Sequence, residues 1–174
     1  MNKEKFRLDM QGAIFDLDGT LFDSMWVWNQ VDLDFLGKRG FEVPDDYTKA
    51  IAHMDAHRTA RYTIDRFGLS EDIDDIVNEW FEMAKDKYAY DVICKQGAYE
   101  YVEKLHNQGV KIAIATSSDK VLFEKTLERT GLNKFIDAVV MVKEVNKGKS
   151  HPDVYLEAAR RLGTNPCDTV VYED

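Results

Sequence analysis

The chain has 174 residues, 44% of them hydrophobic, so it can bury a core and is neither a disordered nor a fibrous protein. Its net charge of −9, with no cluster of Lys and Arg interleaved with aromatics, excludes nucleic acid as an expected partner. No stretch approaches the roughly 20 apolar residues of a membrane helix, and two distant cysteines without a signal-like N-terminus favour a cytoplasmic protein. We expect a monomer or a weak dimer.

Four apolar segments of strand length lie along the chain. They comprise residues 12–15, 110–115, 136–142 and 169–172, and all are rich in Ile, Val and Ala. Near-continuous apolar runs are typical of strands that are covered on both faces. The segments therefore predict a parallel sheet that lies between helices.

Residues 21–90 separate the first strand from the next crossover helix and contain no convincing strand. One predicted helical face carries Met25, Trp28, Val31 and Phe35. A second helical pattern ends at Gly68, and a third, longer stripe runs from Ile73 to Ala84. We therefore predict an inserted, all-helical cap over residues 21–90, in which 37–46 connect two helices.

Helices and strands alternate from residue 97 onward. The predicted helices cover residues 98–105 and 119–129, and a third begins at Pro152. This alternation is typical of a doubly wound α/β fold with a parallel sheet, in which ligands bind beyond the carboxyl ends of the strands. We assign residues 1–20 and 91–174 to this α/β core.

The first predicted strand ends in Asp16-Leu17-Asp18-Gly19-Thr20. If the strand continues, Asp16 and Asp18 project to the same side, about 6–7 Å apart. Carboxylates that close would repel each other and raise one pKa unless a cation lay between them, so the pair indicates a metal site. Gly19 allows a sharp turn, and Thr20 can hydrogen-bond to the loop backbone.

Other chemical groups stand at further strand and loop ends. Residues 116–118 (Thr-Ser-Ser) precede a helix and offer hydroxyls and backbone N–H groups to an anion. Lys149 lies in a loop, and the fourth strand runs into Glu173 and Asp174. Taken alone, a Ser or Thr before a helix is an ordinary N-cap, and a loop lysine is usually solvated. In a doubly wound sheet, however, these ends share one crevice, and we expect one site.

Four segments occur in a fixed order: FDLDGTLFDS, IATSS, GKSHPD and VVYED. In order and spacing they resemble the haloacid dehalogenase-like hydrolases, specifically the phosphoglucomutase-like group with a helical cap. The resemblance spans residues 12–174. It implies a Rossmann-like core with an inserted cap, and Mg²⁺-dependent hydrolysis of a small phosphorylated metabolite through an aspartyl phosphate.

The resemblance implies a role for each matching residue. Asp16 would be the nucleophile, and Asp18 the general acid and base; Thr116 and Lys149 complete the catalytic set. The residues implied to bind substrate phosphate are Asp16, Gly19, Thr20, Thr116, Ser117 and Lys149. Mg²⁺ would be bound by Asp16, the backbone carbonyl of Asp18 and Asp174, with Glu173 close by.

Two alternatives remain beside a phosphatase. One is a sugar phosphomutase of the same family, which keeps the aspartyl phosphate long enough to return it to another hydroxyl. The other is a receiver-like or degenerate phosphate-binding module, which also places Asp, Thr and Lys at strand ends. A receiver has no inserted cap, and both the cap and the DxDGT string argue against this reading.

Substrate choice is expected to lie in the cap. We expect His53, His57 and Arg58 to lie on a helix after the stretch 47–51, and Arg58 or His57 is our candidate for contact with the leaving group, although a solvated helix face fits them as well. In the family the acidic pair is followed by a further turn, helix and strand. Because the chain ends at Asp174, we expect an impaired activity in this form.

Overall fold

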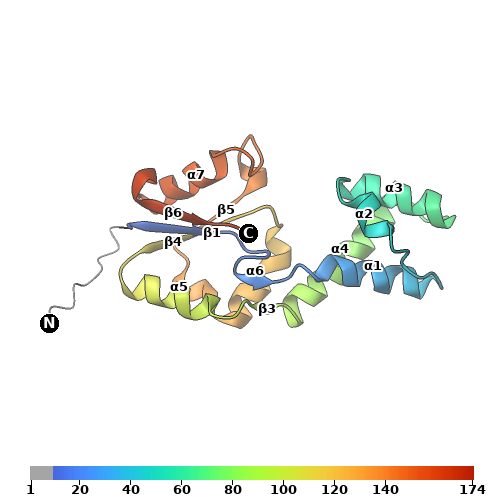
Figure 1. The fold of residues 1–174 in the computed structure, drawn as a ribbon, viewed down its shortest axis with the longest axis horizontal. Coiled ribbons are helices and arrows are strands. Elements are labelled where there is room, and N and C mark those ends of the chain that lie inside the picture. The colour runs from blue at the N-terminus through green and yellow to red at the C-terminus, as the bar shows by residue number, and fades with distance from the viewer. Residues whose placement is uncertain (1–9) are drawn as a thin grey trace. The chain divides into compact units, whose positions relative to one another are not determined.

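The computed structural model describes residues 10–174, which form two compact units (Figure 1). One unit combines the segment up to Ser24 with Ile93–Asp174, and the other consists of Met25–Val92. The sequence predicts this insertion at residues 21–90. Within the described residues, no helix is both long enough and apolar enough to cross a membrane.

The first unit contains a parallel sheet with the strand order β5-β4-β1-β6. Its strands are β1 (Gly12–Phe15), β4 (Lys111–Thr116), β5 (Ala138–Met141) and β6 (Thr169–Tyr172). The expected α/β fold with a parallel sheet is confirmed. Strand β5 is shorter than the predicted 136–142, because 3-10 helices occupy Leu132–Phe135 and Val142–Glu144 on either side of it.

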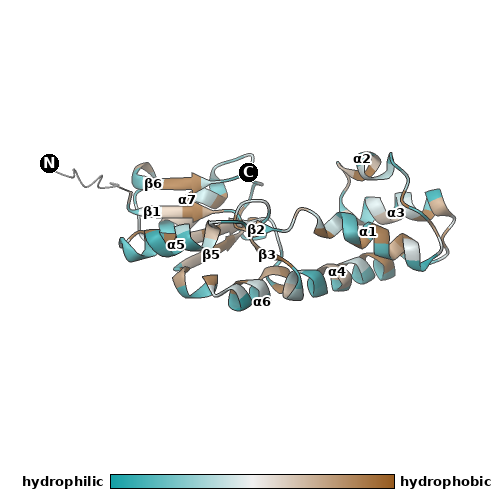
Figure 2. Cartoon of the chain, turned by 60° about the horizontal axis from the view of Figure 1, so that its bottom comes forward, coloured by the Kyte–Doolittle hydropathy of each residue, from teal (hydrophilic) through white to brown (hydrophobic). Residues whose placement is uncertain are grey.

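Helices cover both faces of this sheet. Helix α7 (Asp153–Leu162) lies on one face, and α5 (Ala98–Asn107) and α6 (Lys120–Thr130) lie on the other (Figure 1). One buried cluster joins the sheet to α7 and consists of Ile14, Ala113, Ala115, Val140, Val154, Ala158 and Ala159. Figure 2 shows β6 as largely hydrophobic and α5 as rich in hydrophilic residues. The packed apolar side chains fix the strand ends that carry the site.

A two-stranded antiparallel ribbon also belongs to this unit, where the sequence predicted no strand. It pairs β2 (Phe22–Asp23) with β3 (Ile93–Cys94), and β2 falls inside the range expected to be all-helical. Strands of two residues are too short to show an alternating pattern, so periodicity could not reveal them. The ribbon ties together the two places where the chain leaves and re-enters the unit.

The second unit, which we call the helical unit, contains only helices. They are α1 (Val27–Lys38), α2 (Tyr47–Ile51), α3 (Ala56–Phe67) and α4 (Ile73–Tyr90). The rings of Phe35 and Trp80 pack edge to face with centroids 5.3 Å apart. The expected face of α1 is corrected in part: Val31 and Phe35 are buried, but Met25 and Trp28 are 61% and 45% exposed.

Candidate active site

Asp16 stands directly after β1, at the carboxyl edge of the sheet. Its backbone N–H donates a hydrogen bond to the carbonyl of Tyr172 at 3.0 Å, which extends the β1–β6 ladder by one step. The residue that follows Tyr172 is Glu173, so the parallel register brings Asp16 beside the acidic pair. Asp16 is only 6% exposed. A carboxylate is thus held at the strand end by backbone geometry.

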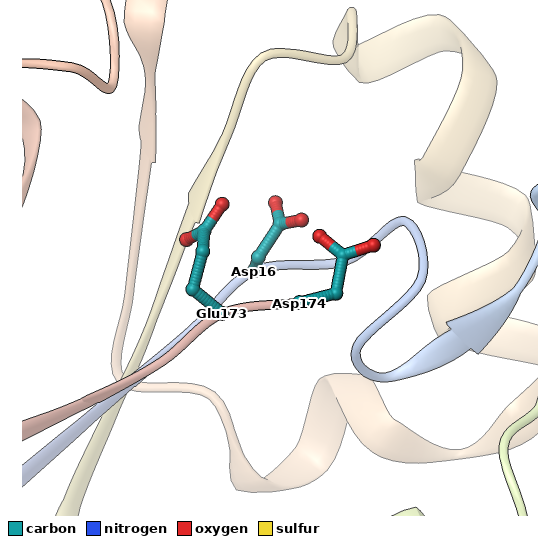
Figure 3. A group of neighbouring side chains, drawn as sticks. All are labelled: Asp16, Glu173 and Asp174. Carbon is teal, nitrogen blue, oxygen red and sulfur yellow. The ribbon is translucent and has the colours of Figure 1, made fainter.

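Three carboxylates gather at this edge. Oxygens of Asp16, Glu173 and Asp174 all lie within 4.8 Å of one another. Figure 3 shows the three side chains rising from the ends of two neighbouring strands toward the same side. Asp16 is buried, whereas Glu173 and Asp174 are exposed. Such a cluster offers the all-oxygen donor set that hard divalent cations prefer.

Lys149 supplies a positive charge to this cluster. Its Nζ forms ion pairs with Asp16 Oδ1 and with Glu173 Oε1, the latter at 2.7 Å, and the Tyr155 hydroxyl donates to Glu173 Oε2 at 3.1 Å. Burial raises the pKa of Asp16 above its usual value, and the charge of Glu173 adds to the rise, whereas Lys149 and the backbone N–H of Leu17 oppose it. Lys149 therefore favours the ionised carboxylate.

Asp18 lies outside the three-carboxylate cluster and is held by two serine hydroxyls instead. Ser24 Oγ donates to Asp18 Oδ1 at 2.6 Å, and Ser118 Oγ donates to Asp18 Oδ2. The carboxylate oxygens of Asp16 cluster with those of the acidic pair after β6, and the pairing of Asp16 with Asp18 at a cation stays a prediction. The sequence did not indicate either serine contact with Asp18; Ser118, expected to face an anion, is 100 residues away from Asp18 along the chain.

The loop after Asp18 turns sharply. Gly19 has a φ of 81°, which a side chain would disfavour, and its N–H donates to the Phe22 carbonyl at 3.1 Å. The expected hydrogen bond from Thr20 to the loop backbone is absent: within residues 10–174 its buried Oγ1 has no partner. Thr20 also lines a cavity with Phe15 and Leu21.

Thr116 ends β4, the strand on the other side of β1. It is fully buried, and its Oγ1 accepts a hydrogen bond from the Ser118 N–H at 3.0 Å. Ser117 between them is exposed. Because β1 pairs with both β4 and β6, the strand ends that carry Thr116, Asp16 and Glu173 are neighbours along one sheet edge. That edge is where a doubly wound sheet binds its ligands.

The cap candidates belong to the helical unit. His57 and Arg58 lie in the first turn of α3, and the Arg58 N–H donates to Asp55 Oδ1 at 2.9 Å. His57 Nε2 lies 3.3 Å from Asp74 Oδ1. His53 precedes α3 and lies in a turn, not on the expected helix. His57 and Arg58 also line a cavity of about 460 Å³ within this unit.

Comparisons with known proteins place this geometry in context. The family model of the haloacid dehalogenase-like hydrolases matches residues 13–174. Protein SUPPRESSOR OF QUENCHING 1, chloroplastic, from Arabidopsis thaliana is 30% identical over 169 residues, which make up 95% of this chain and 16% of that protein. Hexitol phosphatase B from Escherichia coli K12 is 27% identical over 168 residues, or 93% of this chain and 74% of that enzyme.

A solved structure supports the fold. A Thermotoga maritima protein assigned as a candidate β-phosphoglucomutase superposes with a TM-score of 0.85 at 24% identity, covering 95% of this chain and 76% of that one. At this identity the likeness concerns the arrangement of strands and helices. Inferences about the reaction therefore rest on the local geometry of Asp16, Lys149 and the acidic pair.

Proposed function

The chain belongs to the haloacid dehalogenase-like hydrolases, and on that basis we propose that it is a Mg²⁺-dependent phosphatase that hydrolyses a small phosphorylated sugar or alditol through an aspartyl phosphate on Asp16. One observation carries the proposal. Asp16 is a buried carboxylate at the end of a central strand, ion-paired with Lys149 and beside two further carboxylates. A nucleophile and a cation site thus share one sheet edge.

In the proposed reaction, an Asp16 oxygen attacks phosphorus and forms an acyl phosphate as the bond from phosphorus to the alcohol oxygen breaks. Asp18 donates its proton to the departing oxygen, so the leaving group is a neutral alcohol. Asp18, now ionised, then takes a proton from a water molecule that attacks the acyl phosphate. Inorganic phosphate departs, and Asp16 is regenerated as a carboxylate.

Ser24 and Ser118 position Asp18 for this proton transfer. Each donates to a different carboxylate oxygen, which fixes the plane of the carboxyl group. A positioned acid and base contributes typically 10²–10⁴-fold to a reaction rate. The two hydroxyls should therefore matter for the rate of the chemical step more than for binding.

Lys149 reduces the repulsion between an anionic nucleophile and an anionic phosphoryl group. Its Nζ already contacts Asp16, so a phosphoryl group that approaches Asp16 also comes within reach of this charge. We propose that the Ser117 backbone N–H and the Thr116 hydroxyl donate to the remaining phosphoryl oxygens, while Gly19 shapes the loop beside them. These donors and Lys149 start from separate segments at the sheet edge, which suits a tetrahedral ligand.

The residues present fit Mg²⁺. Three carboxylates against one lysine leave the cluster with excess negative charge, and the raised pKa of Asp16 reflects burial that a divalent ion would offset. We propose that Asp16, Asp174 and the backbone carbonyl of Asp18 hold the ion, with Glu173 close by. When bound, the ion supplies positive charge that stabilises the phosphoryl oxygens in the transition state.

Phosphate release from a panel of phosphorylated sugars, alditols and short-chain acids, with and without Mg²⁺, tests the proposal. We expect Mg²⁺-dependent release that Asp16→Asn lowers by about 10³-fold or more. Asp45→Asn, at an exposed loop aspartate of the helical unit, is the matched control. Full activity of Asp16→Asn would overturn the mechanism. Rapid release from several sugar phosphates would argue against a phosphomutase, which retains the phosphoryl group.

A further inference from the structure

The position of the Lys149 charge depends on the carboxylates around it. Lys149 lies in a turn before α7, in neither a helix nor a strand, and its side chain is 18% exposed. Its Nζ contacts Asp16 Oδ1 and Glu173 Oε1. A lysine carries its charge on a long, flexible stem. The groups that face Nζ therefore decide where the charge lies.

Glu173 is the less constrained of these two carboxylates. Its side chain is 33% exposed, whereas that of Asp16 is 8% exposed. A glutamate has several rotatable bonds, and holding it in one conformation costs rotamer entropy. Lys149 occupies only Oε1, and the Tyr155 hydroxyl donates to Oε2 at 3.1 Å. Each oxygen of Glu173 thus has its own donor, which fixes the plane of the carboxylate.

Tyr155 is itself anchored in the core. It lies in the first turn of α7, and its ring packs against the buried cluster that joins this helix to the sheet. A tyrosine hydroxyl sits at the end of a rigid ring with only two side-chain torsions. Packing of the ring therefore sets the position of the hydroxyl that Glu173 accepts from.

These contacts form a chain from the core to the proposed nucleophile. It runs from Tyr155 to Glu173, from Glu173 to Lys149, and from Lys149 to Asp16. We propose that Tyr155 is a positioning residue, whose hydroxyl orients Glu173 so that Glu173 holds Lys149 against Asp16. Tyr155 lies outside the four segments that carry the family resemblance.

The inference rests on the proposed function only where it names Asp16 as the nucleophile; the effect on Lys149 needs no catalysis. Tyr155→Phe removes the hydroxyl and keeps the ring that packs against the core, so it separates positioning from packing. Tyr99→Phe is the matched control, since it removes a hydroxyl from α5, which covers the other face of the sheet (Figure 1).

Acylation of lysines in the metal-free full chain by N-hydroxysuccinimidyl acetate, followed by peptide mass spectrometry, tests the inference without a substrate. We expect Lys149 to react about 3–10-fold faster in Tyr155→Phe than in the wild type, because the two carboxylates cover its amine less firmly. Lys147, exposed in the same loop, should react at an unchanged rate. In Tyr99→Phe both lysines should react as in the wild type. An unchanged Lys149 rate in Tyr155→Phe would overturn the inference.

Steady-state kinetics with a sugar phosphate and Mg²⁺ provide the second measurement. Tyr155→Phe should lower kcat about 3–10-fold in the wild type and change nothing further in Glu173→Ala, because the chain of contacts is already broken there. An equal loss of kcat in both backgrounds would show that Tyr155 acts through packing and would overturn the inference.

The two proposals fail in different ways. A wild type without phosphatase activity, or a fully active Asp16→Asn, counts against the phosphatase, and the acylation of Lys149 then decides the positioning role alone. An inactive Asp16→Asn together with a Tyr155→Phe that matches Tyr99→Phe in both measurements leaves the phosphatase standing and removes Tyr155 from its mechanism.

Discussion

Replacing Asp32 by Asn should stabilise the protein, and the gain should depend on pH. Asp32 lines a cavity of about 420 Å³ in the helical unit, and burial raises the pKa of its carboxyl from 3.8 to about 6. An acid with a raised pKa in the folded state carries its charge at a cost above that pKa. Asn has nearly the same shape and carries no charge at any pH.

The magnitude follows from linkage. The rise from 3.8 to about 6 is about 2 pH units, each worth 1.36 kcal/mol, so the ionised carboxylate costs up to about 3 kcal/mol of unfolding free energy. Because the side chain is partly exposed, we expect the ionised carboxylate to lower the free energy of unfolding by about 1–3 kcal/mol. The favourable contribution of the protonated form is complete below pH 3.8 and is lost as pH rises through about 6.

Urea denaturation of the wild type and Asp32→Asn between pH 4 and pH 8 measures this difference. The two proteins should have similar midpoints near pH 4, and the variant should be more stable by about 1–3 kcal/mol at pH 8. Asp45→Asn, at an exposed position in the same unit, should show no such trend. A stability difference that is the same at every pH would refute the assignment of the charge cost to Asp32.

Three further predictions concern catalysis. Ser118→Ala removes a hydroxyl that donates to Asp18 and should lower kcat about tenfold with little change in KM; an effect on KM alone would contradict a positioning role. Lys149→Met should lower kcat/KM for a phosphorylated substrate by about 10²–10³-fold, and unchanged steady-state kinetics would remove Lys149 from the site. Arg58→Ala should change the ratio of kcat/KM values between two substrates with different leaving groups by about tenfold, and an unchanged preference would show that Arg58 is a solvated surface residue.

The gathering of charged side chains at the sheet edge could be predicted because it depends on topology. Strand ends in a parallel doubly wound sheet meet along one edge, so the positions of Asp16, Glu173 and Asp174 follow once their strands are recognised. The strand β1 was predicted with its observed bounds, since a short apolar run leaves little room for error. The loop position of Lys149 fitted the shared crevice, but its role came only from the family resemblance, because a loop lysine has no signal of its own.

Contacts that depend on side-chain detail could not be predicted. The bond from Ser118 to Asp18 joins distant segments, and no local pattern distinguishes Ser118 from Ser117 beside it. Asp32 and Trp80 lie on separate helices, and only the packing of the helical unit brings both to one cavity. The apolar stripe of α1 identified its buried core but not its ends, where Trp28 remains exposed.

A covalent phosphoryl group on Asp16 is the most direct test of the proposed chemistry. The full chain is mixed with Mg²⁺ and a sugar phosphate whose phosphoryl group is radiolabelled. The mixture is quenched in acid within one turnover, and the protein is digested for peptide mapping. We expect hydroxylamine-sensitive label on the peptide that contains Asp16, and none in Asp16→Asn. Label on another residue, or turnover without label together with an active Asp16→Asn, would contradict Asp16 as the nucleophile.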